Sequence, residues 1–213
     1  KYCWWWNKTS IQFYKWNFNI NKNIDGANIE FIGLDTRYFR SELLGKKSNY
    51  KPNVDPNATI LGKDQWKWLE STINNSTADV IIILSSIQIL ATNHQYEKWA
   101  NFPNERERLL NLIANSGVQN PILLSGDRHI AEIMKLVDSR FPNGLYEVTA
   151  SGLTHTWSGI AEEKNSLRVS NLIAQLNYGL ASFDWAKNEL LIEIKGENGS
   201  VYAKQMIQLS KNK

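Results

Sequence analysis

The segment of residues 121–132, PILLSGDRHIAE, most constrains what this chain can fold into. Its first four residues form an apolar run with no polar alternation, and Ser125 and Gly126 follow directly. Such a run is typical of a buried strand of a parallel sheet that presents polar groups at its carboxyl end. In open α/β sheets ligands bind at that end. The segment therefore predicts a functional loop over residues 125–129.

Two residues of this loop, Asp127 and His129, are candidate metal ligands. They lie two positions apart on a turn, so a carboxylate oxygen and an imidazole nitrogen could converge on one ion. The alternative is ordinary turn chemistry, in which the aspartate caps the following residues. One Asp and one His are fewer than the ligands of a usual catalytic metal site, so this segment alone leaves both interpretations open.

Two earlier apolar runs also end in polar side chains. Residues 29–34 are followed by Asp35, Thr36 and Arg37, and the run DVIIILSS of residues 79–86 ends in two serines. Asp35 and Arg37 form either an ion pair that stabilises the turn, or a site in which Asp35 orients a neighbour while Arg37 or Arg40 binds an anion. All three carboxyl ends are expected at one edge of the sheet.

Helical patterns alternate with these strands. Trp66, Leu69 and Ile73 recur at helical spacing in the segment that begins at Gly62, which predicts an amphipathic helix over a sheet. Asn104 and Glu107 have the spacing of a capping box at the start of a second helix. Strand–helix–strand order predicts parallel crossovers and an α/β fold. The connection over residues 87–102, with His94, Glu97 and Trp99, is a candidate lid or site wall.

The second half of the chain is richer in strands. Residues 132–137 and 145–149 are expected to pair, and a polar loop over residues 151–157 carries His155. A helix is expected around residues 167–176. Segments 180–185, 190–195 and 201–209 predict an antiparallel meander to which we assign no chemistry.

The first 28 residues differ in character from the remainder. They contain an aromatic cluster without clear periodicity: Trp4, Trp5, Trp6, Phe13, Tyr14, Trp16 and Phe18. Aromatic faces stack on sugars and bases, but large aromatics more often serve packing. We treat residues 1–28 as a stretch of unclear origin and residues 29–213 as a partial domain.

Composition argues against several classes of function and site. The 24 Lys and Arg residues against 21 Asp and Glu form no long basic block, which argues against a dedicated nucleic-acid surface. The single cysteine, Cys3, excludes an intrachain disulfide and a cysteine-based zinc site. No apolar run reaches the length of a membrane span, and the first residues lack the pattern of a signal peptide.

Five motifs, in order, resemble the PhoD-like alkaline phosphatase D family of metallophosphoesterases. They are LDTRYFR at 34–40, LGKDQWKWLE at 61–70, WANFPNERERLL at 99–110, LLSGDRHIAE at 123–132 and TASGLTHTW at 149–157. The resemblance implies an α/β/β/α sandwich, hydrolysis of phosphate mono- or diesters, a site with Fe3+ and Ca2+, and export from the cell. For this chain it implies metal ligands Asp127 and His129, catalytic Arg37 and His155, substrate-binding Arg37 and Arg128, and Asp35 beside the site.

The family also has an earlier half with further metal-binding motifs, and none of these precedes residue 29 here. The chain is therefore similar to the C-terminal half of the family's catalytic domain. One alternative is an inactive half-domain that acts with a complementary N-terminal half, by self-association or as an interaction module. Another is a small-molecule binder on an α/β sheet that uses no metal.

Overall fold

The computed structural model describes residues 14–19, 27–160 and 162–210, with only the backbone described for residues 14–19. The predictions made for Trp4, Trp5, Trp6 and Phe13 lie outside the described residues.

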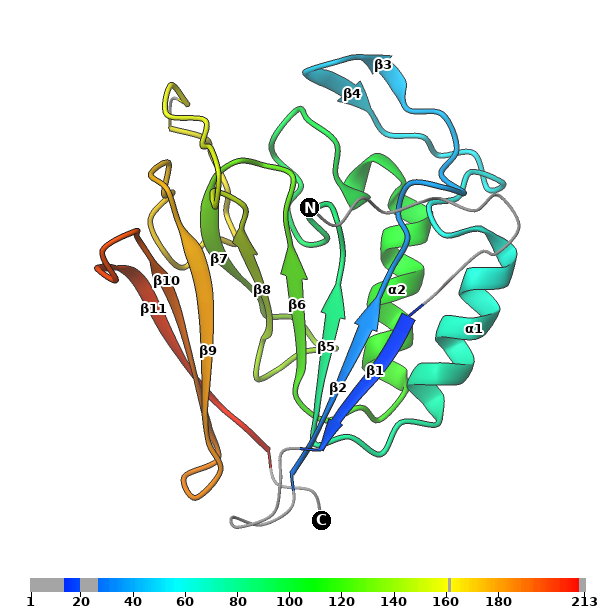
Figure 1. Cartoon of the computed structure of the whole chain (residues 1–213). Coiled ribbons are helices and arrows are strands. Elements are labelled where there is room, and N and C mark those ends of the chain that lie inside the picture. Colours follow the sequence, from blue (N-terminus) through cyan, green and yellow to red (C-terminus); the bar gives the residue numbers. More distant parts are fainter. Residues whose placement is uncertain (1–13, 20–26, 161, 211–213) are drawn as a thin grey trace, which may run out of the picture.

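A six-stranded sheet forms the centre of the molecule (Figure 1). Its strands, in spatial order, are β1 (Tyr14–Asn19), β2 (Asn28–Gly33), β5 (Val80–Leu84), β6 (Pro121–Ser125), β8 (Leu145–Ala150) and β7 (Ala131–Leu136). Strands β2, β5, β6 and β8 are parallel, and β1 and β7 run antiparallel at the two edges. The carboxyl ends of β2, β5 and β6 therefore lie at one edge, as the apolar runs predicted.

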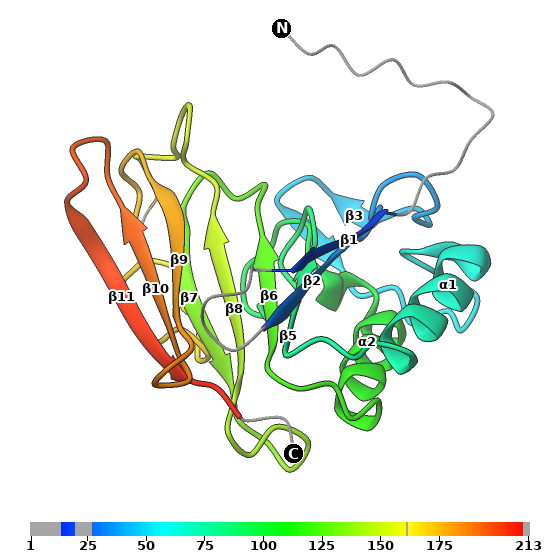
Figure 2. The same cartoon turned by 60° about the horizontal axis from the view of Figure 1, so that its bottom comes forward.

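Two helices cover one face of this sheet, α1 (Gly62–Asn74) and α2 (Pro103–Asn115) (Figures 1 and 2). Trp66, Leu69 and Ile73 of α1 are buried in the core between helices and sheet, as their spacing predicted. Ile83 of β5 and Leu123 of β6 belong to the same core cluster. Within the described residues, no helix is long and apolar enough to cross a membrane.

The opposite face of the sheet packs against a three-stranded antiparallel sheet. Its order is β11 (Val201–Gln208), β10 (Glu189–Lys195), β9 (Tyr178–Asp184). Leu190, Ile192 and Ile194 alternate along β10 and belong to the same core cluster as Val80 and Ile82 of β5. The mostly parallel sheet followed by an antiparallel meander confirms the predicted α/β fold class. The predicted sandwich has four layers. The described part of the chain forms three of them, which are the helices α1 and α2, the six-stranded sheet and the three-stranded sheet.

The prediction of a helix around residues 167–176 is wrong. This segment runs extended beside β7, with isolated bridges from Arg168 to Met134 and from Ile173 to Ala131. Because β7 is an edge strand, its backbone groups need partners, and the segment supplies them. The N–H of Lys135, for example, donates to the carbonyl of Leu167 at 2.8 Å.

The prediction of a capping box at Asn104 and Glu107 is also wrong. Helix α2 begins at Pro103, and the preceding Phe102 makes no side-chain cap. Proline suits the first helical position because its missing N–H would have no helical partner there. Glu107 instead pairs with Arg140 at 2.5 Å, and the amide of Asn104 contacts the carbonyl of Val54.

Several short elements lie where loops were expected. Strands β3 (Leu44–Lys46) and β4 (Asn49–Lys51) form a small hairpin, and η1 (Trp99–Asn101) is a single 3-10 turn. The connection over residues 87–102 is not a loose lid, because Ile87, Ile89 and Trp99 are buried in the core. It does form a wall of the site, through Glu97.

Candidate functional site

Loops from four parallel strands meet at the carboxyl edge of the sheet. Those after β2 and β5 are joined by a hydrogen bond between the hydroxyls of Thr36 and Ser86. The N–H of Leu34 donates to Leu84 and that of Ser85 to Leu124, so the pairing of β2, β5 and β6 continues one residue into each loop. These backbone contacts hold the polar residues that follow in a fixed relation to one another.

His129 and His155 are brought into direct contact at this edge. Their rings lie edge to face, with centroids 4.1 Å apart and an interplanar angle of 66°. The hydroxyl of Thr154 lies 3.1 Å from Nδ1 of His155, which leaves Nε2 of that ring as the atom available for chemistry. Both histidines are exposed. The sequence named each residue but not their contact.

The loop that carries His129 has an unusual backbone. Asp127 has a φ of 65° and His129 a φ of 53°, which is the left-handed region that residues other than glycine seldom occupy. Each such residue costs on the order of 1–3 kcal/mol, and residues of this kind cluster at functional sites. Asp127 and His129, which the sequence suggested as metal ligands, are therefore the two residues of this loop with a strained backbone.

Arg37 connects three loops of the site. Its Nη1 donates to Oε2 of Glu97 at 2.5 Å, and its Nη2 donates to Oδ1 of Asp127 at 3.2 Å. Arg40 approaches the other oxygen of Glu97, with Nε 3.2 Å from Oε1. Glu97, which the sequence placed only in a lid or wall, is therefore the carboxylate that orients both arginines.

Asp35 does not pair with the guanidinium of Arg37. Its Oδ1 accepts the backbone N–H groups of Arg37 and Tyr38, both at 2.9 Å, and so closes the turn. The buried side chain of Gln65 then holds the backbone of Asp35, because its Oε1 accepts the N–H and its Nε2 donates to the carbonyl, each at 2.8 Å. Sequence reasoning missed Gln65, although a glutamine on the buried face of an amphipathic helix was a signal.

Arg128 lies apart from the other cation of the predicted site. It is 5% exposed, and its Nη2 donates to both carboxylate oxygens of Glu163 at 2.7 and 2.9 Å. Its guanidinium carbon lies 5.0 Å from the centre of the Tyr96 ring. The structure therefore brings together Asp127, Arg37 and the histidine pair without the guanidinium of Arg128.

Buried ionisable groups support the loop over residues 87–102. Burial, with the charges of Arg128 and Lys98, lowers the pKa of His94 to about 2, so this imidazole is neutral. Burial also raises the pKa of Glu147 to about 7, although its carboxylate accepts the N–H groups of Ile89 and Leu90.

A metal ion needs more donors than these residues provide together. Across the described residues, no group of three or more His, Cys, Asp and Glu side chains is placed to hold an ion. The imidazoles of His129 and His155 are suitable donors for transition metals, but the nearest carboxylate of the loop, Asp127, faces Arg37. Among the described residues, the site is therefore incomplete as a metal centre.

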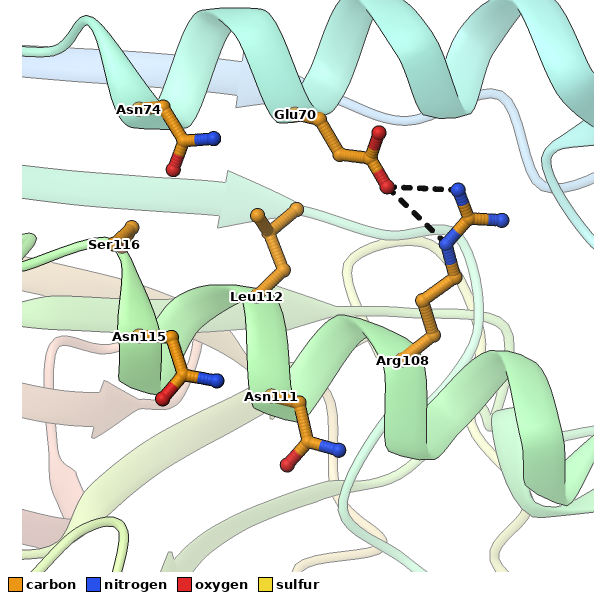
Figure 3. Close-up of a pocket in the computed structure, with 7 residues that line it drawn as sticks. All are labelled: Glu70, Asn74, Arg108, Asn111, Leu112, Asn115 and Ser116. Carbon is orange, nitrogen blue, oxygen red and sulfur yellow. Dashed lines mark hydrogen bonds and ion pairs between the residues drawn. The ribbon is translucent and has the colours of Figure 1, made fainter.

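A separate groove of about 440 Å³ lies between α1 and α2 (Figure 3). It is lined by Glu70, Asn74, Arg108, Asn111, Leu112, Asn115 and Ser116. Arg108 pairs with Glu70 at 2.7 Å in it. None of its lining residues belongs to the site at the sheet edge.

Comparison with known proteins identifies the family. The family model of the PhoD-like phosphatases matches residues 21–195. The chain belongs to this family.

This chain spans only part of the length of the relative and of the two solved structures that it matches. Alkaline phosphatase D of Bacillus subtilis (strain 168) is 31% identical over 115 residues, which is 49% of this chain and 20% of that protein. A solved structure titled "Structure of PhoD" has a TM-score of 0.71 at 21% identity and covers 95% of this chain and 42% of its own. GAP50, the anchor in the inner membrane complex of Plasmodium, has a TM-score of 0.66 at 15% identity over 94% of this chain and 56% of its own. These two structures show the fold alone.

Two of the PhoD-like motifs contact each other inside the protein. Glu105, from the segment 99–110, accepts hydrogen bonds from Nε1 of Trp66 at 2.8 Å and from the N–H of Ile60 at 2.7 Å. Trp66 belongs to the segment 61–70, and its ring packs at 6.5 Å from that of Trp99. These motif residues thus serve the junction of α1 and α2 rather than chemistry.

Proposed function

We propose that this chain provides one side of the active site of a metal-dependent phosphoesterase. The observation that carries the proposal is the contact of His129 with His155 beside Asp127 and Arg37, in a member of the PhoD-like family. The substrate class is phosphate mono- or diesters, as the resemblance to the family implies, and the Bacillus relative is named an alkaline phosphatase. Export from the cell belongs to the same proposal.

Arg37 is the proposed phosphate-binding residue. It is half exposed, and its planar fork of donors suits two phosphoryl oxygens. Its contacts with Glu97 and Asp127 orient the guanidinium before substrate arrives. The turn closed by Asp35 and held by Gln65 keeps the arginine at the edge of the sheet. Donors oriented in advance in this way can stabilise the charge of a transition state.

His155 is the proposed proton donor, through its free Nε2. His129 and Asp127 are the proposed contribution of this chain to a metal site, with Fe3+ and Ca2+ as the ions implied by resemblance. A bound ion would neutralise phosphate charge and acidify water. The remaining ligands would come from an N-terminal half or from a second copy.

A second candidate function is a half-domain that is inactive alone. The incomplete ligand set of the described residues favours it. In that case the chain acts only after a complementary half has bound, or it serves as an interaction module.

Hydrolysis of p-nitrophenyl phosphate and bis(p-nitrophenyl) phosphate by the purified chain, with Ca2+ and Fe3+ added, tests the first proposal. Where a second copy supplies the remaining ligands, we expect turnover that is lost in His129→Ala and Arg37→Gln and is kept in Arg108→Gln, which alters an arginine of the α1–α2 groove. A folded chain without turnover in any condition would contradict activity of the chain alone and support the half-domain. Thermal unfolding unchanged by metal ions or chelator would contradict metal binding by the chain alone and leave the half-domain and the metal-free binder.

A further inference from the structure

Arg128 lies between two site residues in the sequence, but its side chain leaves the site. Asp127 and His129 are exposed, whereas Arg128 is buried. The left-handed backbone at both neighbours belongs to a sharp turn in which the N–H of Arg128 donates to the carbonyl of Gly126 at 2.8 Å. The turn therefore presents its two outer residues and directs the arginine inward.

Two contacts fix the buried guanidinium. Nη2 donates to both oxygens of Glu163, and the guanidinium lies over the ring of Tyr96. Charge-assisted hydrogen bonds and stacking on an aromatic face are both directional, so together they set the position of each partner.

These partners lie on two loops, that of residues 87–102 and the one that carries His155. Tyr96 contacts the ring of Trp157 edge to face at 5.2 Å, and the N–H of Trp157 donates to the carbonyl of His129 at 2.8 Å. Glu163 lies farther along the loop that carries His155. The loop of His155 is thus attached to residues 128–129 at Trp157 and again at Glu163.

The burial of Arg128 is not explained by stability alone. Within the described residues its Nε has no hydrogen-bond partner. Its charge also lowers the pKa values of His94 and Lys98, after burial the largest cause in each case. A buried charge with incomplete partners is costly, and apolar side chains of similar size often replace such ion pairs without loss. A role in positioning accounts for its presence here.

We propose that Arg128 is a positioning residue that holds His155 against His129 by anchoring Glu163 and Tyr96. The inference rests on the proposed function in taking the two histidines as part of the site. Its test measures their geometry, which can change whether or not the chain hydrolyses an ester.

The experiment is NMR of the imidazole groups in the full chain, which has three histidines. We expect a nuclear Overhauser effect between the rings of His129 and His155 in the unaltered protein. Arg128→Met and Glu163→Gln should both lose it while the amide signals of β5 and β6 stay in place. Arg108→Met is the matched control, because Arg108 also pairs with a glutamate at 2.7 Å and lies over an aromatic ring, that of Trp66 at 4.2 Å. It should keep the ring-to-ring signal.

A lower melting temperature with the ring-to-ring signal intact in both variants would show a merely structural role and overturn the proposal. If Arg128→Met does not fold, Glu163→Gln decides, since it keeps the shape of the side chain and removes its charge. Loss of the signal in the Arg108→Met control as well would also overturn it.

Discussion

The imidazole of His129, which follows β6, lies edge to face against the imidazole of His155, which follows β8, with ring centroids 4.1 Å apart. Because β6 and β8 are parallel neighbours, their carboxyl ends deliver the two rings to the same place. This contact is the centre of the candidate site, and the first prediction concerns it.

Replacing His129 by alanine should weaken binding of Co2+ by at least ~10-fold, since its ring offers a nitrogen donor to a transition-metal ion. Replacing His155 should weaken it less, because His155 is the proposed proton donor. A titration followed by calorimetry measures the affinity. His94→Asn is the control, because His94 is buried and should not reach an added ion. Equal affinities in the unaltered chain and in His129→Ala would contradict the placement of a metal at His129.

Glu105→Ala should lower the free energy of unfolding by about 3 kcal/mol or more. The carboxylate is 6% exposed and accepts hydrogen bonds from Trp66, Ile60 and Thr59, all of which would lose their acceptor. Urea unfolding followed by tryptophan fluorescence measures the change. Glu107→Ala on the same helix is the control, because Glu107 is half exposed and its ion pair should contribute less than about 1 kcal/mol. Similar losses in both variants would refute the buried role of Glu105.

Glu147→Gln should change how stability depends on pH. The folded protein raises the pKa of Glu147 from 4.5 to about 7, chiefly by burial, so the folded state binds this proton more tightly than the unfolded chain. The resulting stabilisation is complete below pH 4.5 and is lost as pH rises through 7, with an upper limit of about 3 kcal/mol. Urea unfolding at pH 5 and pH 8 measures it. The variant should lack this loss, and an unchanged difference between the two pH values would contradict the prediction.

His94 should act in the opposite direction. Its folded pKa of about 2 lies below its ordinary value of 6.5, again chiefly through burial, so the unfolded chain binds the proton first. Stability from this group is complete above pH 6.5 and is lost as pH falls, by up to about 1.4 kcal/mol per pH unit. The opposing effects of His94 and Glu147 should largely cancel between pH 6.5 and 5 in the unaltered protein.

The cancellation gives a paired measurement. His94→Asn should become more stable as pH falls from 6.5 to 5, and Glu147→Gln should become less stable over the same interval. Unfolding free energies at three or four pH values are sufficient. Parallel pH dependence in the two variants would show that one of the two shifted pKa values is wrong.

Local patterns predicted the main elements because each depends on neighbours in the sequence. The apolar runs before Asp35 and Asp127 became β2 and β6, and the spacing of Trp66, Leu69 and Ile73 became the buried face of α1. The helix expected around residues 167–176 failed because its backbone serves the open edge of β7, a demand that comes from another segment. The capping box failed because Pro103 begins the helix one residue before Asn104.

The sequence suggested which residues lie at the candidate site and on which loops, but it did not predict their hydrogen-bond partners. Arg37 was expected beside Asp35, yet its guanidinium pairs with Glu97 and Asp127. Gln65 was not expected at all, although it holds the turn of Asp35. These partners come from segments far apart in the chain, and no spacing of residues encodes such contacts.

The sequence by itself determined the order of the main strands and of helices α1 and α2, the family, and the edge at which polar residues gather, because hydrophobic periodicity and motif order are properties of a linear chain. Only the tertiary structure decided that His129 touches His155 and that Arg128 turns inward to Glu163. Those contacts depend on which strands are neighbours and in what register they pair. That register is set by strand pairing across the whole sheet and not by the few residues that make each contact.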